Sequence, residues 1–357
     1  MKVLIAAGGT GGHIYPGIAV GREILKRDPA SEVLFVGTAR GLEKNIVPDN
    51  GFQLSLINSA GLKNVGFIGK LKGMAVLPRS FWEARKILKE FKPDVVVGAG
   101  GYVSGPVLMT AHFMGFPTLV MDSNALPGFT NRMLARFVDK AALAFDAAKP
   151  FFGAKGTVTG NPVRPEFFEI PAREPSGQIN LLIFGGSQGA RAINNAMVDA
   201  LPVLNGTKDK LSITHQTGEN NYEVVRERYA KAAWDNVDIR PYITNMVESF
   251  EQADLIICRS GATTCAEVAA AGKPALMIPF PGAADDHQRK NAEAMAAEGA
   301  VKMVLQSDLS SESLANEIRD LVNDHERLVS MGTAARKMAR TDAAEKTVDM
   351  IEELAAK

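Results

Sequence analysis

The sequence predicts an α/β protein made of two doubly wound domains, each built around a parallel β-sheet. Three observations support this class. Apolar, β-branched runs are continuous rather than alternating; a glycine-rich turn and a helical pattern follow each run; and the whole arrangement occurs twice along the chain. Continuous apolar strands that alternate with helices indicate a parallel sheet covered on both faces.

Four segments carry this order of strand, glycine turn and helix. Their strands are expected at residues 2–7, 94–97, 180–184 and 254–258, and their turns begin at residues 8, 98, 185 and 260. Each half thus has one turn after its opening strand and a second turn further along. We therefore expect domains over residues 1–162 and 163–340, which would face each other across a deep cleft, a common place for a ligand.

The remaining segments follow from local patterns. Residues 160–165, with Pro171 and Pro175 behind them, are typical of a linker between domains. Residues 341–357 have the pattern of an amphipathic helix, which is available to pack back on the first domain.

Composition narrows the possible classes of protein. The 357-residue chain has 46% apolar and 22% charged residues, which excludes a disordered chain, a collagen and a disulfide scaffold. Its 40 basic and 40 acidic side chains cancel, but they are unevenly divided. Residues 1–161 hold 19 basic and 11 acidic residues, net +8, so the remainder is net −8. This asymmetry indicates a surface or a polyanion as partner of the first half.

The number of cysteines and the lengths of the apolar runs indicate the cellular compartment. Cys258 and Cys265 are too few to staple a chain of this length, and free thiols fit a reducing cytoplasm. The apolar N-terminus is too short for a signal peptide and reads as a buried first strand. Residues 95–121 lack Asp, Glu, Lys and Arg, but glycines and prolines interrupt them. We expect a buried strand, turn and helix there rather than a membrane span.

Several cofactor sites are excluded. A dinucleotide fingerprint needs a third glycine where Ile14 stands, and an acidic residue after the second strand, where Gly37 and Thr38 stand instead. The chain has no P-loop, no Asp-x-Asp pair and no His-x-His pattern. A glycine turn that leads into a helix can nevertheless hold phosphate on backbone N–H groups, although glycine also closes ordinary strand–helix turns.

The motifs together resemble one family. They are Gly8-Gly9-Thr10-Gly11-Gly12-His13, Gly101-Tyr102-Val103-Ser104-Gly105-Pro106, Gly160-Asn161-Pro162-Val163-Arg164, Gly185-Gly186-Ser187-Gln188-Gly189-Ala190-Arg191 and Cys258-Arg259-Ser260-Gly261-Ala262. Their order and spacing are similar to those of the MurG family of bacterial N-acetylglucosaminyltransferases. The resemblance implies the GT-B fold, UDP-N-acetylglucosamine as donor and undecaprenyl-pyrophosphoryl-N-acetylmuramoyl-pentapeptide as acceptor. It also implies that the acceptor 4-hydroxyl attacks with inversion, in the step of peptidoglycan synthesis that turns lipid I into lipid II.

The resemblance places the nucleotide sugar on the second domain. Ser187 would bind the diphosphate, and Glu267 would bind the ribose hydroxyls. Glu267 also fits a capping box with Thr264, which would use its carboxylate at the helix end instead. A matching strand-to-helix turn would be formed by Gly261, Ala262, Thr263, Thr264, Cys265 and Ala266.

Three further residues are implied for the donor, each with a plainer alternative. Ile243 would contact uracil through its backbone, or else be an apolar core residue. Gln288 would bind sugar hydroxyls, or else lie in a solvated loop. Arg164 would reach the donor from the linker, or else be solvated. Backbone N–H groups need no metal to hold diphosphate, so no obligatory protein-bound metal is expected, and a divalent cation would assist only through the substrate diphosphate.

The first domain would supply acceptor contacts and the base. Thr10, Gly11 and Gly12 would contact the donor sugar or the acceptor diphosphate, and Asn124 would bind the N-acetylglucosamine moiety. The family often reads His-Glu-Gln-Asn at this last site, whereas this chain reads Met121-Asp122-Ser123-Asn124, so no role of that histidine transfers. His13 alone among the histidines follows the first glycine turn, and it titrates near neutral pH. We predict His13 as the base, with Asp122 as the rival. A histidine at the start of a helix is also often only a cap or a phosphate ligand.

Residues 61–92 combine basic and apolar side chains. The basic residues outnumber Glu83 and Glu90, giving net +6, and Phe81 and Trp82 lie among them. This mixture is typical of an interfacial surface, although an amphipathic helix with a core-facing stripe gives the same pattern. With a lipid acceptor, we expect a peripheral protein on the cytoplasmic face of the bacterial inner membrane, bound to anionic lipid and not to nucleic acid. Other cell-wall synthesis or division proteins are further candidate partners.

Two other functions fit the same motifs. A UDP-N-acetylglucosamine epimerase of this fold would convert the free donor without any lipid acceptor. A non-catalytic UDP-sugar-binding protein at the membrane would bind UDP but would not depend on His13 or Asp122.

Overall fold

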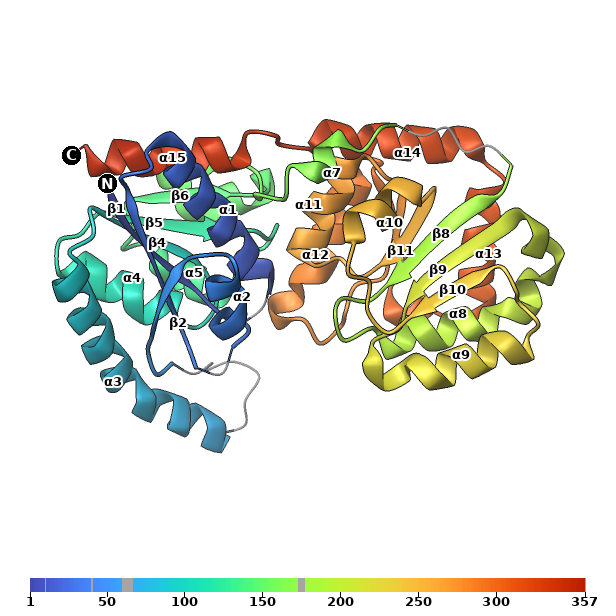
Figure 1. Ribbon diagram of the computed structural model, residues 1–357, viewed down its shortest axis with the longest axis horizontal. Helices are drawn as coiled ribbons and strands as arrows, with labels where there is room; N and C mark the ends of the chain where they lie inside the picture. The colour runs from blue at the N-terminus through green and yellow to red at the C-terminus, as the bar shows by residue number, and fades with distance from the viewer. Residues whose placement is uncertain (10, 40, 60–66, 173–176, 357) are drawn as a thin grey trace. The chain divides into compact units, whose positions relative to one another are not determined.

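The computed structural model describes residues 1–9, 11–39, 41–59, 67–172 and 177–356. The chain divides into two compact units (Figure 1). The N-terminal unit consists of Met1–Val163 and Arg340–Lys357, and the C-terminal unit of Arg164–Ala339. Each unit is a parallel sheet with helices on both faces, so the predicted α/β class is confirmed.

The N-terminal unit has the strand order β3-β2-β1-β4-β5-β6-β7, and every neighbouring pair is parallel. The strands are β1 (Lys2–Ala7), β2 (Glu32–Gly37), β3 (Gln53–Leu56), β4 (Val95–Gly100), β5 (Thr118–Asp122), β6 (Lys140–Leu143) and β7 (Gly156–Val158). The helices are α1 (Gly11–Arg27), α2 (Glu43–Asp49), α3 (Phe67–Phe91), α4 (Ser104–Phe113), α5 (Phe129–Leu134), α6 (Lys149–Phe152) and α15 (Ala343–Ala355).

Successive side chains of β1 pack into the cores on opposite faces of the sheet, because neighbouring side chains of a strand point to opposite faces. Val3 and Ile5 pack with α1, α2 and α15, whereas Leu4 and Ala6 pack with α3 and α4. All four side chains are fully buried. A sheet buried on both faces explains why β1 reads as a continuous apolar run rather than an alternating one.

The last helix, α15, belongs to the N-terminal unit and lies beside α1 (Figure 1). Its Val348, Ile351 and Leu354 are buried in the same core as the first strand. At the surface the Arg27 guanidinium donates to the carboxylates of Asp349 (2.7 Å) and Glu352 (2.9 Å). The end of the chain therefore completes one face of the first sheet.

The C-terminal unit has the strand order β10-β9-β8-β11-β12-β13, again with parallel neighbours. Its strands are β8 (Ile179–Phe184), β9 (Leu211–Gln216), β10 (Val237–Arg240), β11 (Leu255–Cys258), β12 (Ala275–Met277) and β13 (Val301–Met303). Its helices are α7 (Glu166–Glu169), α8 (Arg191–Leu204), α9 (Tyr222–Lys231), α10 (Met246–Gln252), α11 (Ala262–Ala271), α12 (His287–Ala297), α13 (Ser311–Val322) and α14 (His325–Met338).

Two polar clusters hold this unit together. The Arg336 guanidinium on α14 donates to four carbonyls at the ends of α7 and α11, at 2.5–3.1 Å, and so satisfies groups that a helix end leaves without partners. In the core, the fully buried His215 ring bonds the Tyr229 hydroxyl and the Asn194 side-chain oxygen, each at 3.1 Å.

Two expectations about apolar and thiol segments are confirmed. Val95 to Met121 contains β4, a glycine turn and α4, and within the described ranges no helix is long and apolar enough to cross a membrane. Cys258 and Cys265 are both free and buried. Of the expected linker, Pro175 lies outside the described residues, while the boundary between the units falls between Val163 and Arg164.

Candidate functional site

In the N-terminal unit, two glycine turns meet at the carboxyl ends of β1 and β4. A Cβ on Gly101, whose φ is +82°, would lie 2.1 Å from the Gly8 carbonyl oxygen. A Cβ on Gly100, whose φ is +117°, would lie 2.4 Å from the His13 ring. The two turns therefore approach closely because both positions lack a side chain. Thr10, predicted to contact substrate, lies outside the described residues.

His13 is the third residue of α1 and is half-buried. Its Nδ1 lies 3.2 Å from the Gly8 carbonyl oxygen. A carbonyl oxygen can only accept, so this contact requires a proton on Nδ1 and leaves the lone pair of the neutral ring on Nε2. A helix cap must accept hydrogen bonds from N–H groups. His13 Nδ1 instead faces a carbonyl oxygen, so this nitrogen does not cap the helix.

Asp122 ends β5 and is only 3% exposed. Its carboxylate accepts hydrogen bonds from Asn124 N (2.9 Å), Gly128 N (3.2 Å) and Asn131 Nδ2 (2.8 Å). Three donors favour the ionised carboxylate and shape the turn that carries Asn124. The geometry thus gives Asp122 a clear part in positioning this turn, beside any part in proton transfer.

In the C-terminal unit, the turn after β8 carries Ser187, which is exposed. Gly189 lets this turn press against the turn after β9, because a Cβ there would lie 1.8 Å from the Thr217 carbonyl oxygen. The following helix, α8, begins after Ala190, and no side chain caps it. Its first N–H groups therefore have no capping side chain, and the exposed Ser187 hydroxyl precedes them.

Ile243 is 2% exposed, and its N–H donates to Gln216 Oε1 at 2.7 Å. Gln216 also donates from Nε2 to the Gly186 carbonyl oxygen at 2.9 Å. This one amide therefore ties the Ser187 turn to the segment predicted to contact uracil. Because the Ile243 N–H is engaged, a backbone contact with uracil would have to use its carbonyl oxygen.

The turn from β11 to α11 begins the helix at Ala262, with Gly261 as N-cap and no side-chain cap. The capping-box alternative for Glu267 is wrong, because that box would start the helix after Thr264 rather than at Ala262. Within the turn, Cys265 N donates to the Gly261 carbonyl oxygen at 2.9 Å. The buried Thr263 hydroxyl has no hydrogen-bond partner in the structure. Ala266 follows on the next helical position.

Glu267 and Arg164 lie together in the C-terminal unit. Arg164 Nη2 is 4.0 Å from Glu267 Oε1, and the guanidinium stacks 4.9 Å from the Phe167 ring centroid. Burial raises the pKa of Glu267 to about 7, an effect that the positive charge of Arg164 partly offsets. The Arg164 side chain is 46% exposed, so this pair is open to solvent on its arginine side.

Gln288 lies on the first turn of α12 and is half-buried, not part of a solvated loop. Its Oε1 accepts from Phe280 N at 3.0 Å, so a sugar hydroxyl would meet its amide nitrogen. Nearby, the buried Arg259 guanidinium donates to the Ile278 and Pro279 carbonyls, at 2.9 and 3.0 Å. Burial lowers the pKa of Arg259 to about 10, and the side chain fixes the segment that leads to Gln288.

Sequence reasoning missed three residues that shape these turns: Glu43, Gln216 and Arg259. Arg259 stands inside a quoted motif, which is the signal that could have identified it. Three glycines, at positions 8, 37 and 41, leave room for the buried Glu43 side chain. The sequence alone gives no indication of the role of Gln216, because its hydrogen-bond partners, Gly186 and Ile243, are distant along the chain.

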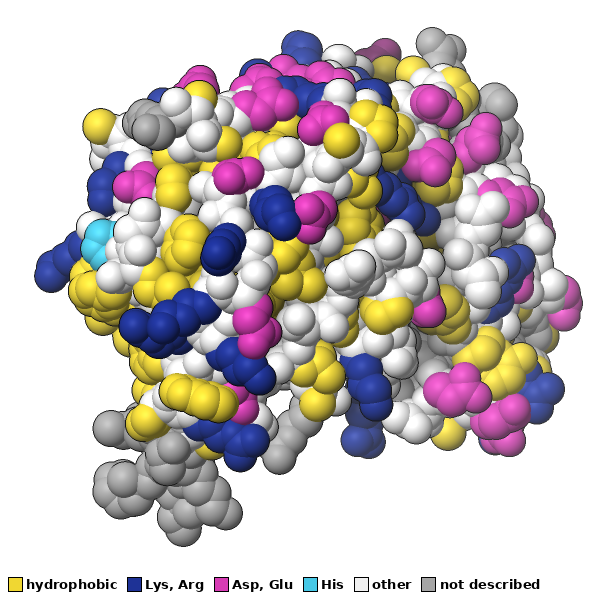
Figure 2. All heavy atoms as spheres, turned by 60° about the vertical axis from the view of Figure 1, so that its left-hand side comes forward, with side chains coloured by type: hydrophobic (Ala, Val, Ile, Leu, Met, Phe, Trp, Pro, Cys, Tyr) yellow, Lys and Arg dark blue, Asp and Glu magenta, His cyan; other side chains and the backbone are white. Residues whose placement is uncertain are grey.

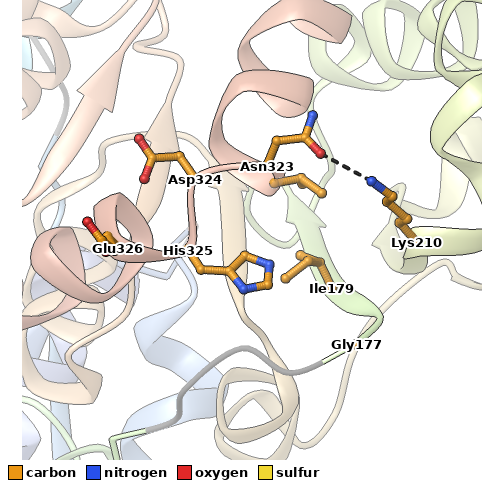
Figure 3. A pocket seen from close by; sticks show the side chains of 8 residues that line it. Gly177, Ile179, Lys210, Asn323, Asp324, His325 and Glu326 are labelled. Atoms are coloured by element: carbon orange, nitrogen blue, oxygen red, sulfur yellow. Dashed lines mark hydrogen bonds between the residues drawn. The ribbon is translucent and has the colours of Figure 1, made fainter.

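A cavity of about 570 Å³ lies elsewhere in the C-terminal unit, lined by Ile179, Lys210, Asn323, Asp324 and His325 among others (Figure 3). Lys210 Nζ contacts Asn323 Oδ1 at 3.4 Å across it. Ile179 begins β8, so the cavity is at the amino end of that strand. Ligands of such sheets bind at the carboxyl ends, where the Ser187 turn follows β8 and the Gly261 turn follows β11.

Comparison with known proteins identifies the family. Residues 3–143 match the model of the glycosyltransferase family 28 N-terminal domain, and residues 180–347 match its C-terminal domain. A Geobacter sulfurreducens protein named UDP-N-acetylglucosamine–N-acetylmuramyl-(pentapeptide) pyrophosphoryl-undecaprenol N-acetylglucosamine transferase is 47% identical over 355 residues, which covers 98% of this chain and 97% of that protein. The crystal structure of Acinetobacter baumannii MurG has 34% identity and a TM-score of 0.83, with 99% of each chain covered.

This chain belongs to the MurG family. The predicted GT-B fold, with its two Rossmann-like units, is confirmed by these matches. A crystal structure of a UDP-GlcNAc 2-epimerase from Neisseria meningitidis has a TM-score of 0.72 over 99% of this chain, but only 16% identity. That likeness shows a common fold alone. The uncapped turns belong to the C-terminal unit and the His13 turn belongs to the N-terminal unit, and each is a candidate site within its own unit.

Proposed function

We infer that this chain transfers N-acetylglucosamine from UDP-N-acetylglucosamine to the 4-hydroxyl of N-acetylmuramoyl-pentapeptide on undecaprenyl pyrophosphate. One observation carries the inference: 47% identity to a transferase of this name over nearly the full length of both chains. In the reaction the bond from the anomeric carbon to UDP breaks, and UDP keeps the electron pair. The acceptor oxygen bonds the same carbon from the opposite face, and its proton passes to a base.

We propose that the C-terminal unit binds the donor through N–H groups and dipoles rather than cationic side chains. The N-termini of α8 and α11 have no side-chain caps, and a diphosphate would occupy them together with the Ser187 hydroxyl. The unpartnered Thr263 hydroxyl would gain a hydrogen bond from the same ligand. Glu267, with Arg164 beside it, would accept the ribose hydroxyls.

The proposed base is His13, which the Gly8 contact holds with its lone pair on Nε2. The acceptor proton would move to Nε2 as the new glycosidic bond forms, and Nδ1 would keep its proton throughout. Asp122 remains the alternative. Its carboxylate already accepts hydrogen bonds from Asn124 N, Gly128 N and Asn131 Nδ2, and protonation would weaken these bonds, which makes it the weaker candidate.

We propose that the surface over α3, α4 and α5 binds the membrane. Among the α3 side chains that the structure describes, residues 76–91, the buried ones are Ser80, Ala84 and Leu88, while Phe81 and Trp82 are 37% and 65% exposed. The alternative, an amphipathic helix whose apolar residues face the core, therefore does not explain the exposed aromatic side chains. α4 and α5 contact this layer in turn and add Phe113, Phe129 and Met133, exposed by 72%, 49% and 58%.

Basic side chains surround these apolar groups. Arg79 and Lys86 on α3 are 70% and 62% exposed, and Arg136 beyond α5 is exposed. Figure 2 shows hydrophobic side chains among Lys and Arg side chains toward the left of the view, while acidic ones gather near the top. Each basic residue close to an anionic leaflet contributes about 1 kcal/mol. Of the range 61–92 predicted for this surface, residues 61–66 lie outside the described residues.

The membrane proposal is tested with vesicles. Lys89 is exposed in the last turn of α3. Lys89→Glu combined with Trp82→Ala should reduce sedimentation with phosphatidylglycerol vesicles and leave UDP affinity unchanged. Lys26→Glu is the matched control, because Lys26 is 70% exposed on α1, on the opposite face of the sheet. Equal loss of vesicle binding in the control would contradict the assignment to this face. A positive result would support a peripheral location at the anionic inner membrane.

Metal dependence remains a proposal. Within the described part of the chain, no three His, Cys, Asp or Glu side chains are grouped to hold an ion. We propose that a divalent cation acts only through the diphosphate of the substrate. UDP affinity measured in EDTA should then stay within about threefold of its value in Mg²⁺, whereas loss of UDP binding in EDTA would contradict the proposal.

The reaction itself is tested with labelled donor and lipid I. Purified protein should form labelled lipid II, and His13→Ala should lower kcat without changing UDP affinity. Conversion of the free donor without lipid I would indicate an epimerase instead. UDP binding with no turnover of either kind would indicate a nucleotide-sugar-binding protein without catalytic activity.

A further inference from the structure

Glu43, the first residue of α2, has a fully buried side chain. Its Oε2 accepts from Gly9 N at 3.0 Å, and its Oε1 accepts from Thr38 N at 2.8 Å and Thr38 Oγ1 at 2.7 Å. A buried carboxylate that receives three hydrogen bonds is stable in its ionised form. Burial alone would raise the pKa of Glu43, but the bonds from Gly9 and Thr38 outweigh it and hold the pKa below its ordinary value.

The sequence around Glu43 is shaped to admit it. A Cβ on Gly41 would lie 1.9 Å from its Oε2, and a Cβ on Gly37 would lie 2.5 Å from its Cγ. A Cβ on Gly8 would lie 3.0 Å from its Oε1. Three glycines, from the end of β1, the end of β2 and the loop before α2, thus leave the space that this one side chain fills.

One peptide unit connects Glu43 to His13. The N–H of Gly9 donates to the Glu43 carboxylate, and the carbonyl of the same peptide, on Gly8, faces His13 Nδ1 at 3.2 Å. A trans peptide directs these two groups to opposite sides. Negative charge at the N–H polarises the amide and makes its carbonyl a stronger acceptor, since hydrogen bonds in a chain reinforce one another.

We propose that Glu43 is a positioning residue that acts through the Gly8–Gly9 peptide to fix the tautomer of His13. The carboxylate strengthens the Gly8 carbonyl, the carbonyl holds the Nδ1 proton, and Nε2 keeps the lone pair that accepts the acceptor proton. This inference rests on the proposed function for its catalytic consequence, but the tautomer itself can be measured without any activity.

Other charges near α1 are placed differently. Lys44 and Asp49, on the same helix as Glu43, are exposed. β1 and β2 carry Lys2 and Glu32 at their amino ends, where these two residues pair with each other at 2.9 Å. β4 carries no charged residue, and Tyr102 follows it. The charged residues of α15 that meet α1 face Lys26 and Arg27, in its last turn. Glu43 is therefore a buried charge that is linked through one peptide to the His13 end of α1.

The test is ¹⁵N NMR of labelled histidine, with the His13 signals assigned from His13→Gln. In the wild type we expect the Nδ1–H tautomer to dominate. Glu43→Gln keeps the shape of the side chain but removes its charge and one acceptor. It should move His13 toward a mixture of tautomers, because the Gly8 carbonyl becomes a weaker acceptor for the Nδ1 proton. kcat should fall about tenfold, with UDP affinity unchanged.

Asp139→Asn is the matched control. The Asp139 carboxylate also accepts the N–H and hydroxyl of one threonine, Thr118, at 2.8 and 2.9 Å, but at the amino end of β5. It should leave the His13 tautomer and kcat unchanged. Unaltered His13 signals in Glu43→Gln, with only a fall in melting temperature, would overturn the proposal and make Glu43 a structural support.

Glu43→Asp provides a second variant if the glutamine form does not fold. This variant keeps the charge but moves it one methylene away from the Gly9 N–H. The tautomer ratio of His13 should therefore lie between those of the wild type and Glu43→Gln. Unchanged, wild-type His13 signals in Glu43→Asp would also count against the proposal. Failure of the wild type to make lipid II, with the tautomer effect intact, would reject the proposed function alone.

Discussion

The buried His215 should make the stability of the C-terminal unit depend on pH in a way that one substitution removes. The ring is fully buried between Tyr229 and Asn194. Asn194 donates from Nδ2 to the Thr217 carbonyl at 2.8 Å, so its Oδ1 accepts from His215 Nε2 and the Tyr229 hydroxyl donates to Nδ1. This network suits the neutral ring, because a proton on Nδ1 would face the hydroxyl that now donates to it.

The magnitude follows from proton linkage. Burial lowers the pKa of His215 to about 3, against 6.5 in the unfolded chain. Between these values the unfolded state binds a proton and the folded state does not, so stability falls as the pH falls below 6.5. From pH 8 to pH 5 the free energy of unfolding should decrease by about 2 kcal/mol through this group, at about 1.4 kcal/mol per unit.

Glu267 works in the opposite direction over the same range. Its pKa is raised to about 7 in the folded unit, so its protonation stabilises the fold as the pH falls. The contribution of His215 must therefore be measured as the difference between two curves of unfolding free energy against pH, one for the parent and one for His215→Gln. His215→Gln cannot titrate, and its stability at pH 5 relative to pH 8 should exceed that of the parent by about 2 kcal/mol.

Urea unfolding followed by tryptophan fluorescence measures this difference. The chain has two tryptophans: Trp82 is 65% exposed on α3, and Trp234 is 3% exposed in the core of the C-terminal unit. In a Trp82→Phe background the signal reports that unit alone. Identical pH dependence in the His215→Gln and parent proteins would refute the reasoning, since it would mean that the buried ring does not resist protonation.

Three further predictions follow from the same contacts. Below about pH 7 the KM for the donor should rise as Glu267 is protonated, and this rise should vanish in Glu267→Gln, whose KM is high at every pH. Arg336→Ala leaves four carbonyls without their donor and should destabilise the C-terminal unit by about 2–4 kcal/mol in the Trp234 assay. Its control is Arg289→Ala, which removes a 46% exposed arginine of α12, and an equal loss in the control would contradict this prediction. Ile351→Ala should cost the N-terminal unit about 2–4 kcal/mol, seen as faster hydrogen exchange in β1 but not in β8.

Much of the fold could be predicted because its signals are local. The apolar runs of β1, β4, β8 and β11, and the glycine turns behind them, read directly as strand, turn and helix. Glycine at positions 100 and 101 was visible as part of a turn. The reason why glycine is required there could not be predicted, because the atoms that exclude a Cβ belong to His13 and Gly8, about 90 residues away.

The start of α11 shows how a local pattern can mislead. Thr264 and Glu267 have the spacing of a capping box, but the helix begins at Ala262. Ser260 is held by its Oγ bond to the Gln288 carbonyl at 2.8 Å, and Arg259 by the carbonyls that follow β12. Contacts with distant segments therefore set where the helix begins, and they free Glu267 from the helix end.

The sequence alone determined the fold class, the two glycine-turn sets and the family, because period, spacing and motif order are properties of neighbouring residues. Tertiary structure alone decided which groups meet within each unit. Gln216 joins the Ser187 turn to Ile243, Glu43 reaches His13 through one peptide, and Glu267 acquires its raised pKa from burial. Hydrogen bonds and desolvation depend on atoms brought together by folding, so no pattern along the chain could have stated them.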